Sequence, residues 1–353
     1  SALARSFPGL YASNSVDLGN NDILKEAGQN GSSANIICKD CVVPPDQCSE
    51  NKPTQAGLET AVGKNNNGEI DGSIYIGDPQ LPPLPTAPTT ACSATSGPNC
   101  SINLGAITDN ITLPRDGTDD ITYHTPGQPF HYVVTSINFT GNEKVTVNTN
   151  KYPHSLTADA AAGANSISVD SASGYAVNTK LQIGSDTSIY TISDVSGTTL
   201  TITPSLGTAQ TSGAVVQRAD RDPVYLYVSS DVSLGGNGAI AHTGRPADLR
   251  LYGKPADANN SNDQTITISG GSQASHIFIY APDARVGING GSNDPDILGA
   301  VWAKTWNASG SDNADIKVPD DMPMQLGGSF SGAGMQAFSS GSPSTWQRQP
   351  VSQ

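Results

Sequence analysis

Two clusters of aspartates are the residues of this sequence best suited to acid–base chemistry. Asp116, Asp119 and Asp120 lie in the stretch PRDGTDDIT, and Asp294 and Asp296 lie in GGSNDPDILG. An enzyme that cleaves a polysaccharide needs paired carboxylates and a basic group that converge on one groove. These aspartates stand in glycine-flanked turns, which favour aspartate for conformational reasons alone. We therefore assign no catalytic residue and expect a chain that is not an enzyme, with a polysaccharide-active lyase or hydrolase as the alternative.

A second candidate is a calcium loop between residues 65 and 72. Oxygen-bearing side chains occur there at alternate positions around a glycine, namely Asn65, Asn67, Glu69 and Asp71. Such spacing is typical of a calcium loop, but the leading aspartate and the closing bidentate glutamate of an EF-hand are missing. An Asn/Gly turn explains the same residues. Calcium is thus the one cofactor that we consider, and otherwise we expect none.

Histidines and tryptophans offer weaker candidates. The five histidines are dispersed without the spacing of a metal site: His124, His131, His154, His242 and His276. We expect His276, twenty residues before Asp296, to make a hydrogen bond at the edge of a turn. Trp302 and Trp306 would share one face of a strand, where they could stack on a sugar or pack beneath the C-terminal segment; we favour packing.

All five cysteines lie in the first third of the chain: Cys38, Cys41, Cys48, Cys92 and Cys100. The CxxC of Cys38 and Cys41 could bind zinc or carry out redox chemistry, but a second ligand pair and a βαβ setting are both missing. Structural disulfides are the favoured interpretation, with Cys92 bonded to Cys100 and two of the other three joined. Disulfides indicate an exported protein.

Composition excludes several classes of partner. The formal net charge is −14, which disfavours nucleic acid and anionic membranes because both require clustered lysine and arginine. Helix-forming stretches are scarce, and only residues 55–62 lean towards a helix. The chain starts at Ser1 without a hydrophobic leader, so either it is soluble by nature or an N-terminal segment has been removed.

The fold must be organised by an internal repeat. Glycine-containing segments recur at a step of twenty residues, and the same step would place Ile277 opposite Ile297. The three segments are 268–274, 288–294 and 308–314. A period near twenty, built from short β runs and glycine turns, predicts a solenoid whose coils stack on one another. We predict an all-β chain whose core is a right-handed parallel β-helix.

An insertion interrupts this solenoid. Residues 132–142 (YVVTSINFTGN) resemble residues 227–237 (YVSSDVSLGGN), which suggests adjacent coils that are far apart in sequence. Residues 153–217 between them are rich in Ala, Ser, Thr and Gly and alternate in polarity, as expected of a small antiparallel β module. We predict a discontinuous β-helix domain, 1–152 and 218–353, with an inserted domain, 153–217.

Two flanking segments have an irregular composition. Residues 78–99 are too rich in proline for a helix or a central strand, and they are either a flexible linker or an ordered strap along the solenoid; we favour the strap. The C-terminal residues 319–353 carry several apolar side chains. They could cap one end of the solenoid or dock on a neighbouring molecule.

Several of these segments resemble a known family. They are 9–20 (GLYASNSVDLGN), 232–237 (VSLGGN), 279–284 (IYAPDA), 288–291 (INGG) and 298–304 (LGAVWAK). They are similar to the β-helical ectodomain of PilX-like pilus-assembly proteins, over most of residues 9–152 and 220–318. The insertion, through 160–177 and 195–206, resembles small β domains of phage tail and surface proteins.

The resemblance implies an extracellular structural or adhesive component of a bacterial type IV pilus-like surface fibre. Its partners would be other pilus subunits or further copies of itself, with surface glycans as additional ligands and no nucleic acid. The family's ectodomain normally follows a prepilin signal helix in the membrane. This chain lacks that helix, so we expect any anchoring to depend on an N-terminal segment outside the sequence.

Overall fold

The computed structural model describes residues 5–258, 263–269, 275–289, 296–307 and 314–336. The strands of the N-terminal part and of the first returning segments are β1 (Arg5–Ser6), β2 (Pro8–Asp17), β3 (Asp22–Lys25), β4 (Asn35–Cys38), β5 (Cys48–Ser49), β6 (Lys52–Pro53), β7 (Ile74–Ile76), β8 (Ile102–Ile107), β9 (Ile111–Leu113), β10 (Phe130–Phe139) and β11 (Lys144–Val147). The remaining strands are β12 (His154–Ser155), β13 (Ser166–Ser168), β14 (Lys180–Ile183), β15 (Tyr190–Ser196), β16 (Thr199–Thr203), β17 (Val215–Arg218), β18 (Val224–Val228), β19 (Val232–Leu234), β20 (Ala239–Ala241), β21 (Leu249–Tyr252), β22 (Gln264–Ser269), β23 (Ser275–Asn289), β24 (Ile297–Asn307), β25 (Asp315–Val318) and β26 (Met335–Gln336). The helices are short: α1 (Gln55–Ala61), α2 (Asp119–Thr122) and α3 (Met322–Leu326), with 3-10 turns η1 (Pro45–Gln47), η2 (Pro246–Asp248) and η3 (Gly328–Gly332).

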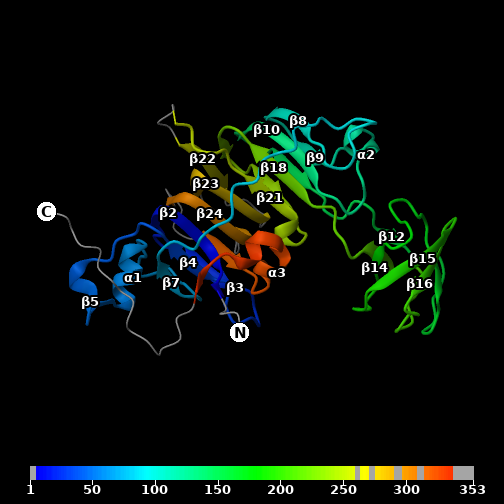
Figure 1. The fold of residues 1–353 in the computed structure, drawn as a ribbon, viewed down its shortest axis with the longest axis horizontal. Helices are drawn as coiled ribbons and strands as arrows, with labels where there is room; N and C mark the ends of the chain where they lie inside the picture. Colours follow the sequence, from blue (N-terminus) through cyan, green and yellow to red (C-terminus); the bar gives the residue numbers. More distant parts are fainter. Residues whose placement is uncertain (1–4, 259–262, 270–274, 290–295, 308–313, 337–353) are drawn as a thin grey trace.

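The chain is all-β, as predicted, and its body is built from parallel strands (Figure 1). Among the described residues, thirteen strands form one large sheet and every pairing in it is parallel. Parallel neighbours require the chain to return to the same end of the sheet before each new strand begins. No helix in the described part of the chain is long and apolar enough to cross a membrane.

The order of strands in space differs from their order in the chain. Strand β8 lies at one end and pairs with the long strand β10. The other side of β10 pairs with two short strands, β18 and β19, which are followed by β21 and β22, then by β23 and finally by β24. Beyond β24 the N-terminal strand β2 comes next, then β4 and β7. The N-terminal residues therefore continue the stack that the C-terminal strands leave open, and Trp302 Nε1 donates a hydrogen bond to the Pro8 carbonyl over 2.7 Å.

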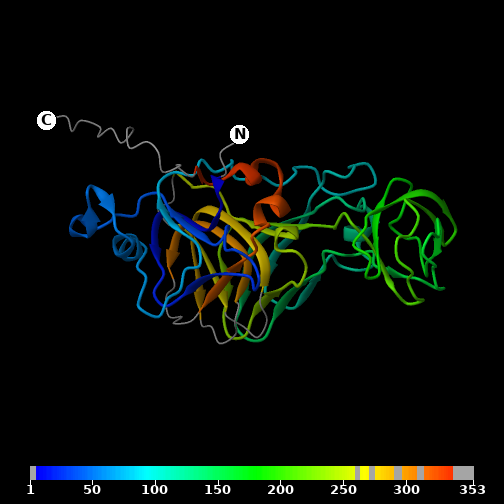
Figure 2. The same ribbon diagram turned by 90° about the horizontal axis from the view of Figure 1, so that it is seen from below.

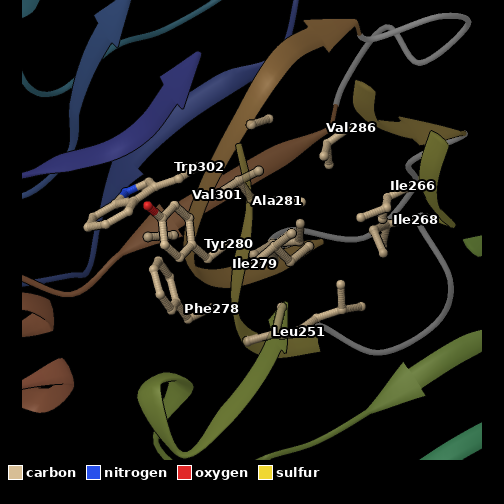
Figure 3. Close-up of a cluster of buried hydrophobic side chains, with 14 of the residues drawn as sticks. Leu251, Ile266, Ile268, Phe278, Ile279, Tyr280, Ala281, Val286, Val301 and Trp302 are labelled. Carbon is tan, nitrogen blue, oxygen red and sulfur yellow. The ribbon is translucent and has the colours of Figure 1, made fainter. Parts of the chain in front are cut away.

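The core consists of apolar side chains stacked on each other, one from each coil. In strand order these are Ile102, Tyr132, Leu226, Leu251, Ile279, Val301, Leu10, Ile36 and Ile74. Figure 3 shows Leu251, Ile279 and Val301 of this ladder. Strand β18 shows how burial alternates along a strand: Val224, Leu226 and Val228 are buried, and the two tyrosines between them are half-buried. Each buried aliphatic side chain stabilises the stack by about 1.5–3 kcal/mol.

A second ladder, on the outer face of the same strands, is largely aromatic; we call it the aromatic row. Its members are Tyr227, Tyr252, Tyr280, Trp302, Tyr11, Ile37 and Tyr75. The C-terminal segment covers its middle: the Phe330 ring lies 5.6 Å from that of Tyr280 and 5.8 Å from that of Trp302. Trp302 thus packs beneath this segment, as predicted, while Trp306 is fully buried beside Val286.

The proline-rich segment 78–99 also lies along the body. In Figure 1 it runs in light blue from β7 to β8, from one end of the stack to the other. The Tyr280 hydroxyl donates a hydrogen bond to the Pro82 carbonyl, and Leu81 and Leu84 pack partly buried against the core. Of the two predicted alternatives, the ordered strap matches these contacts.

The predicted repeat needs a correction of two residues. The step of twenty holds between β22 and β23, where Ile268 lies beside Ile288, but Ile277 lies beside Gly299 and not beside Ile297. Between Ala281 and Arg285 the pairing of β23 with β24 is irregular. The separation in sequence between paired residues is 22 before this point, as for Ser275 and Ile297, and 20 after it, as for Arg285 and Thr305. A shift of two residues keeps every side chain on the same face, so the core pattern tolerates it.

Residues 154–218 form a separate antiparallel sheet of six strands, in the order β12-β17-β14-β15-β16-β13. It has its own apolar cluster, which includes Leu181, Tyr190, Ile192 and Leu200, all with 0% exposure. Figure 2 shows this inserted sheet, in green, projecting from one side of the body.

The segments that join the insert to the body are held together. The buried Asp222 carboxylate accepts hydrogen bonds from the backbone N–H of Gly127 at 2.7 Å and of Lys151 at 3.3 Å, and Asn150 Nδ2 donates to Gln217 Oε1.

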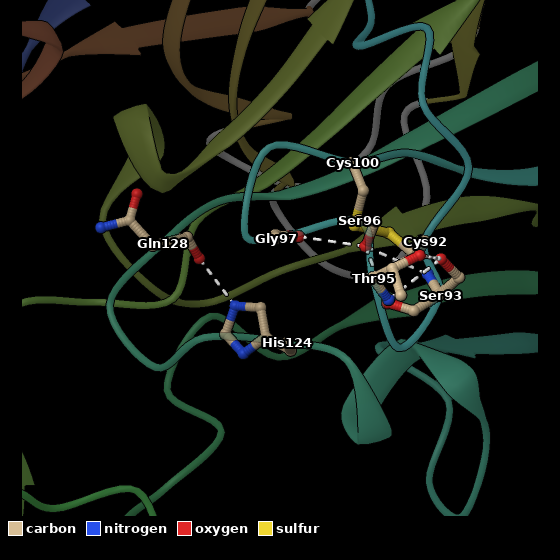
Figure 4. Close-up of a disulfide and its surroundings, with 8 residues drawn as sticks. All are labelled: Cys92, Ser93, Thr95, Ser96, Gly97, Cys100, His124 and Gln128. Carbon is tan, nitrogen blue, oxygen red and sulfur yellow. Dashed lines mark hydrogen bonds between the residues drawn. A yellow bond between two sulfur atoms is a disulfide. The ribbon is translucent and has the colours of Figure 1, made fainter.

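Four cysteines are joined in two disulfides. Cys38 is bonded to Cys41, and Cys92 to Cys100 (Figure 4). Cys48 is the remaining cysteine, and it is exposed. Such cross-links are typical of extracellular and other exported proteins.

Candidate functional site

A cavity of about 600 Å³ lies where several parallel strands end on one side of the body. Parallel pairing brings six strands together in the order β11, β20, β23, β24, β25 and β3. The step from β20 to β23 is a single pairing, of His242 with Ser275. Lining residues lie at or just after the ends of β11, β20, β25 and β3, whereas His276 and Leu298 are the second residues of β23 and β24. With neighbouring strands about 4.8 Å apart, five steps span about 24 Å along the stack.

The polar side chains of the cavity come from all parts of the chain. The ones with functional groups suited to binding are Glu26, Asn150, Arg221, Arg245, His276 and Gln325. Asn150 and Arg221 belong to the two segments that connect the insert to the body. Glu26 belongs to the N-terminal coil and Gln325 to α3, so the cavity exists only because the N-terminal strands stack after β24.

Two histidines, His242 and His276, line the cavity, and the hydrogen bonds of their Nδ1 atoms identify the donor nitrogen of each ring. His242 Nδ1 lies 2.6 Å from the His276 carbonyl oxygen, which can only accept, so Nδ1 carries the proton. His242 Nε2 therefore accepts from the Thr149 hydroxyl at 2.8 Å. Burial lowers the pKa of His242, which is 2% exposed, and keeps the ring neutral. His242 is thus a fully satisfied structural residue.

His276 is arranged differently. Its Nδ1 donates to the Gly244 carbonyl at 2.7 Å, which leaves Nε2 as the ring nitrogen that can accept a hydrogen bond. No partner for Nε2 exists among the described residues. The predicted hydrogen bond at a turn edge is therefore present, but its partner is Gly244 rather than Asp296.

The two arginines of the cavity differ in their partners. Arg245 forms a two-pronged contact with Asp248, with Nη2–Oδ1 at 3.0 Å and Nε–Oδ2 at 3.1 Å, and this contact raises the pKa of the guanidinium. Arg221 makes one side-chain hydrogen bond in the described part of the chain, from Nη1 to Gln217 Oε1 at 3.3 Å. Burial lowers the pKa of Arg221, because partial removal from water disfavours its charge.

The aspartate cluster of residues 116–120 is a structural element. Asp120 is 1% exposed and accepts hydrogen bonds from Arg115, at 2.8 Å to Nη2, and from the Tyr132 hydroxyl at 2.7 Å. Burial raises the pKa of its carboxyl, but these hydrogen bonds outweigh burial and hold the pKa below its usual value. Asp116 pairs with Lys151, and Asp119 is exposed at the start of α2.

In the second aspartate cluster, the described member Asp296 is not among the residues that line the cavity. Asp296 is 3% exposed, and its Oδ2 accepts from the backbone N–H of Asp315 at 3.0 Å. Asp294 lies outside the described residues. Glu26 is the carboxylate that lines the cavity in the described part of the chain, so the carboxylate pair expected of a glycoside hydrolase is not assembled there.

The calcium candidates lie in an exposed turn. The side chains of Asn65, Asn67 and Glu69 are exposed, and Asp71 Oδ2 accepts from the backbone N–H of Lys25 at 2.8 Å. Within the described ranges, no group of three or more His, Cys, Asp or Glu side chains could hold a metal ion. Calcium at this turn stays a hypothesis.

The other histidines make local hydrogen bonds. His131 Nδ1 contacts the Tyr227 hydroxyl at 2.9 Å, His154 Nε2 contacts the Ser173 carbonyl at 2.7 Å, and His124 Nε2 contacts the Gln128 carbonyl at 2.7 Å (Figure 4).

Sequence reasoning missed both arginines of the cavity and the convergence of His242 with His276. The available signal was composition: in a chain with 18 lysines and arginines, the stretch HTGR at residues 242–245 combines two basic side chains with a glycine.

Comparisons with known proteins give a family and two distant structures. A family model described as a domain of unknown function (DUF7305) matches residues 109–323, and no curated protein matches. The tailspike Gp54 of Acinetobacter baumannii bacteriophage AP22, in complex with capsular saccharide, is similar at 12% identity and a TM-score of 0.21. The tailspike gp49 of Pseudomonas phage LKA1 is similar at 13% identity and the same TM-score. Each match covers 62% of this chain and half the length of the tailspike.

These matches correct one expectation. The prediction that the chain is not an enzyme is contradicted, since both matched structures are phage tailspikes and one is a complex with a capsular saccharide. Neither the family match nor the structures bear on pilus assembly.

Proposed function

We propose that this chain, which belongs to the DUF7305 family, is an extracellular surface protein that binds a polysaccharide in the cavity at the strand ends. In this proposal the stacked body is a right-handed parallel β-helix that presents the cavity. The observation that carries the proposal is the shape of the site: its lining comes from six aligned segments and follows the stack for about 24 Å. An elongated site of this kind suits an extended polymer.

The chemistry of the lining supports a carbohydrate ligand. A volume of about 600 Å³ is within the usual range of ligand sites. Arginine, histidine and amide side chains supply both donors and acceptors, which is what a polymer of hydroxyl groups requires. Nucleic acid is disfavoured, because a net charge of −14 repels a phosphate backbone.

Binding to a panel of soluble polysaccharides tests this proposal. The full chain is titrated with each polymer by isothermal calorimetry, and the same mixtures are analysed by size-exclusion chromatography for shortened products. Thr243 is exposed and lines the cavity, so Thr243→Trp places a large ring in the opening. Thr135→Trp, at an exposed position of β10 outside the lining, is the matched control.

We expect at least one polymer to bind the wild type and Thr135→Trp alike, and to bind Thr243→Trp at least about tenfold more weakly. The tryptophan occupies space that the polymer needs, and a tenfold change corresponds to about 1.4 kcal/mol. Equal binding by wild type and Thr243→Trp, or no binding in the whole panel, would contradict the proposal.

A further inference from the structure

Arg221 is a partly buried cation that has no carboxylate partner in the described part of the chain. Three other arginines are paired with aspartates, Arg115 with Asp120 at 2.8 Å, Arg245 with Asp248 at 3.0 Å and Arg218 with Asp220 at 4.0 Å, while the buried Arg250 donates to two carbonyls and the Tyr252 hydroxyl. The chain has 32 acidic and 18 basic residues, so possible partners are abundant. Arg221 nevertheless makes a single long hydrogen bond to Gln217 and lines the cavity.

The charged neighbours of Arg221 act on it without forming a direct ion pair. Asp222 and Asp248 act on it with attraction, and Arg245 acts with repulsion. Asp248 is already engaged by Arg245, and Asp222 accepts backbone hydrogen bonds. A guanidinium has five N–H donors in a planar fork that matches a carboxylate. Its remaining donors therefore suit an anionic group that enters the cavity.

A second, independent observation concerns hydrogen-bond acceptors at the cavity. Asn150 Oδ1 and Gln325 Oε1 are buried and have no hydrogen-bond partner among the described residues, although both side chains line the cavity. An unsatisfied buried acceptor costs about 1–3 kcal/mol. His276 Nε2 is a third acceptor at the cavity. Neutral hydroxyl groups are donors of the required kind.

We propose that the cavity binds a polysaccharide that carries carboxylate groups, such as one built from uronic acids. The sugar carboxylate pairs with Arg221, and sugar hydroxyls donate to the side chains of Asn150, His276 and Gln325. This inference rests on the proposed function and specifies its ligand. A single polyhydroxylated acid would meet both needs of the cavity, since it offers a carboxylate to Arg221 and hydroxyl donors to the three acceptors.

The experiment compares each acidic polymer with its own carboxyl-reduced form. The probes are polygalacturonate, alginate and hyaluronate, each native and reduced, with dextran sulfate to separate carboxylates from other anions. The proteins are the full-length wild type, Arg221→Gln, and Arg285→Gln as a matched control, because Arg285 is exposed in β23 and the change in net charge is the same. Tryptophan-detected unfolding verifies that each variant is folded.

We expect the wild type to bind at least one native acidic polymer at least about tenfold more tightly than its reduced form, since hydrogen bonds to charged groups contribute about that much. Arg221→Gln should lose this preference while it retains the affinity for the reduced polymer, and Arg285→Gln should keep the preference. For the wild type, raising NaCl from 50 to 500 mM should weaken binding of the native form only.

The outcomes separate this inference from the function on which it rests. Equal binding of native and reduced polymers overturns the carboxylate inference but leaves a polysaccharide-binding protein. A preference that survives in Arg221→Gln, or binding of dextran sulfate alone, also overturns it. Absence of binding to every probe and to neutral polysaccharides overturns both.

Discussion

Replacing Phe330 by alanine tests how strongly the C-terminal segment holds to the aromatic row. The ring is 7% exposed, and its centroid lies 5.4 Å from that of Phe278 and 5.6 Å from that of Tyr280, both at angles above 80°. Truncating a buried phenylalanine to alanine costs about 3–5 kcal/mol. Edge-to-face pairs contribute about 0.5–1.5 kcal/mol each beyond burial. We therefore expect the free energy of unfolding to fall by about 4–5 kcal/mol.

The assay is urea unfolding followed by tryptophan fluorescence. Two of the three tryptophans, Trp302 and Trp306, lie in the body, Trp346 lies outside the described residues, and residues 153–217 contain none, so the signal does not report on the insert. The control is Met324→Ala in the same segment, since Met324 is 80% exposed and its removal should change stability by no more than about 0.5 kcal/mol. A loss below about 1 kcal/mol for Phe330→Ala, at an unchanged denaturant slope, would show that this segment is not part of the folded core.

Three further predictions concern other parts of the chain. Asp120→Ala should lower stability by roughly 2–4 kcal/mol at pH 7, because Arg115 and Tyr132 lose a charged acceptor. Since the folded pKa of Asp120 lies below the unfolded value of about 3.9, this stabilisation is present above that pH and is lost as the pH falls through the folded pKa. Urea midpoints of wild type and variant should therefore converge as the pH falls below the unfolded value, and a constant difference would argue against the pairing. Deletion of residues 153–217 with a short Gly/Ser link should leave the tryptophan-detected transition cooperative, because the insert has its own core; a broad transition would show shared stability. Cys48→Ser should leave the urea midpoint unchanged, and peptide mapping without reductant should find the same two disulfides as in the wild type; scrambled pairs would contradict the assignment.

Part of the fold could be predicted from local patterns. The similarity of residues 132–142 and 227–237 correctly aligned Ile137 with Val232, because both strands alternate over the same core and end in the same turn. It failed by one residue at the start, where Val133 and not Tyr132 lies beside Tyr227. Two tyrosines look alike in sequence, yet one faces the core and the other the aromatic row. When the register between two strands shifts by one residue, matching letters in the two sequences no longer lie on the same face of the sheet.

The cavity could not be predicted, for a related reason. Its lining depends on which coil stacks on which, and no local pattern places Glu26 near Gln325. Those two positions meet because β2 and β3 follow β24 and β25 in space. The acidic clusters attracted attention as candidates, but turn formation and the Asp120 ion pair account for them. The pilus-type resemblance stays a prediction that no observation tests.

The stacking of N-terminal strands on C-terminal ones has a consequence for the order of folding. Strand β2 is made first, but its neighbour β24 is made near the end, and Tyr11 meets Trp302 only after nearly 300 intervening residues. Closing a loop of that length costs about 5 kcal/mol of chain entropy, from (3/2)RT ln n. The coils from β8 to β24 can assemble in sequence, each on its predecessor. Strands β2, β4 and β7 can pair with one another early, but one edge of β2 and one edge of β3 stay open to wrong partners until β24 and β25 provide the surface on which they dock.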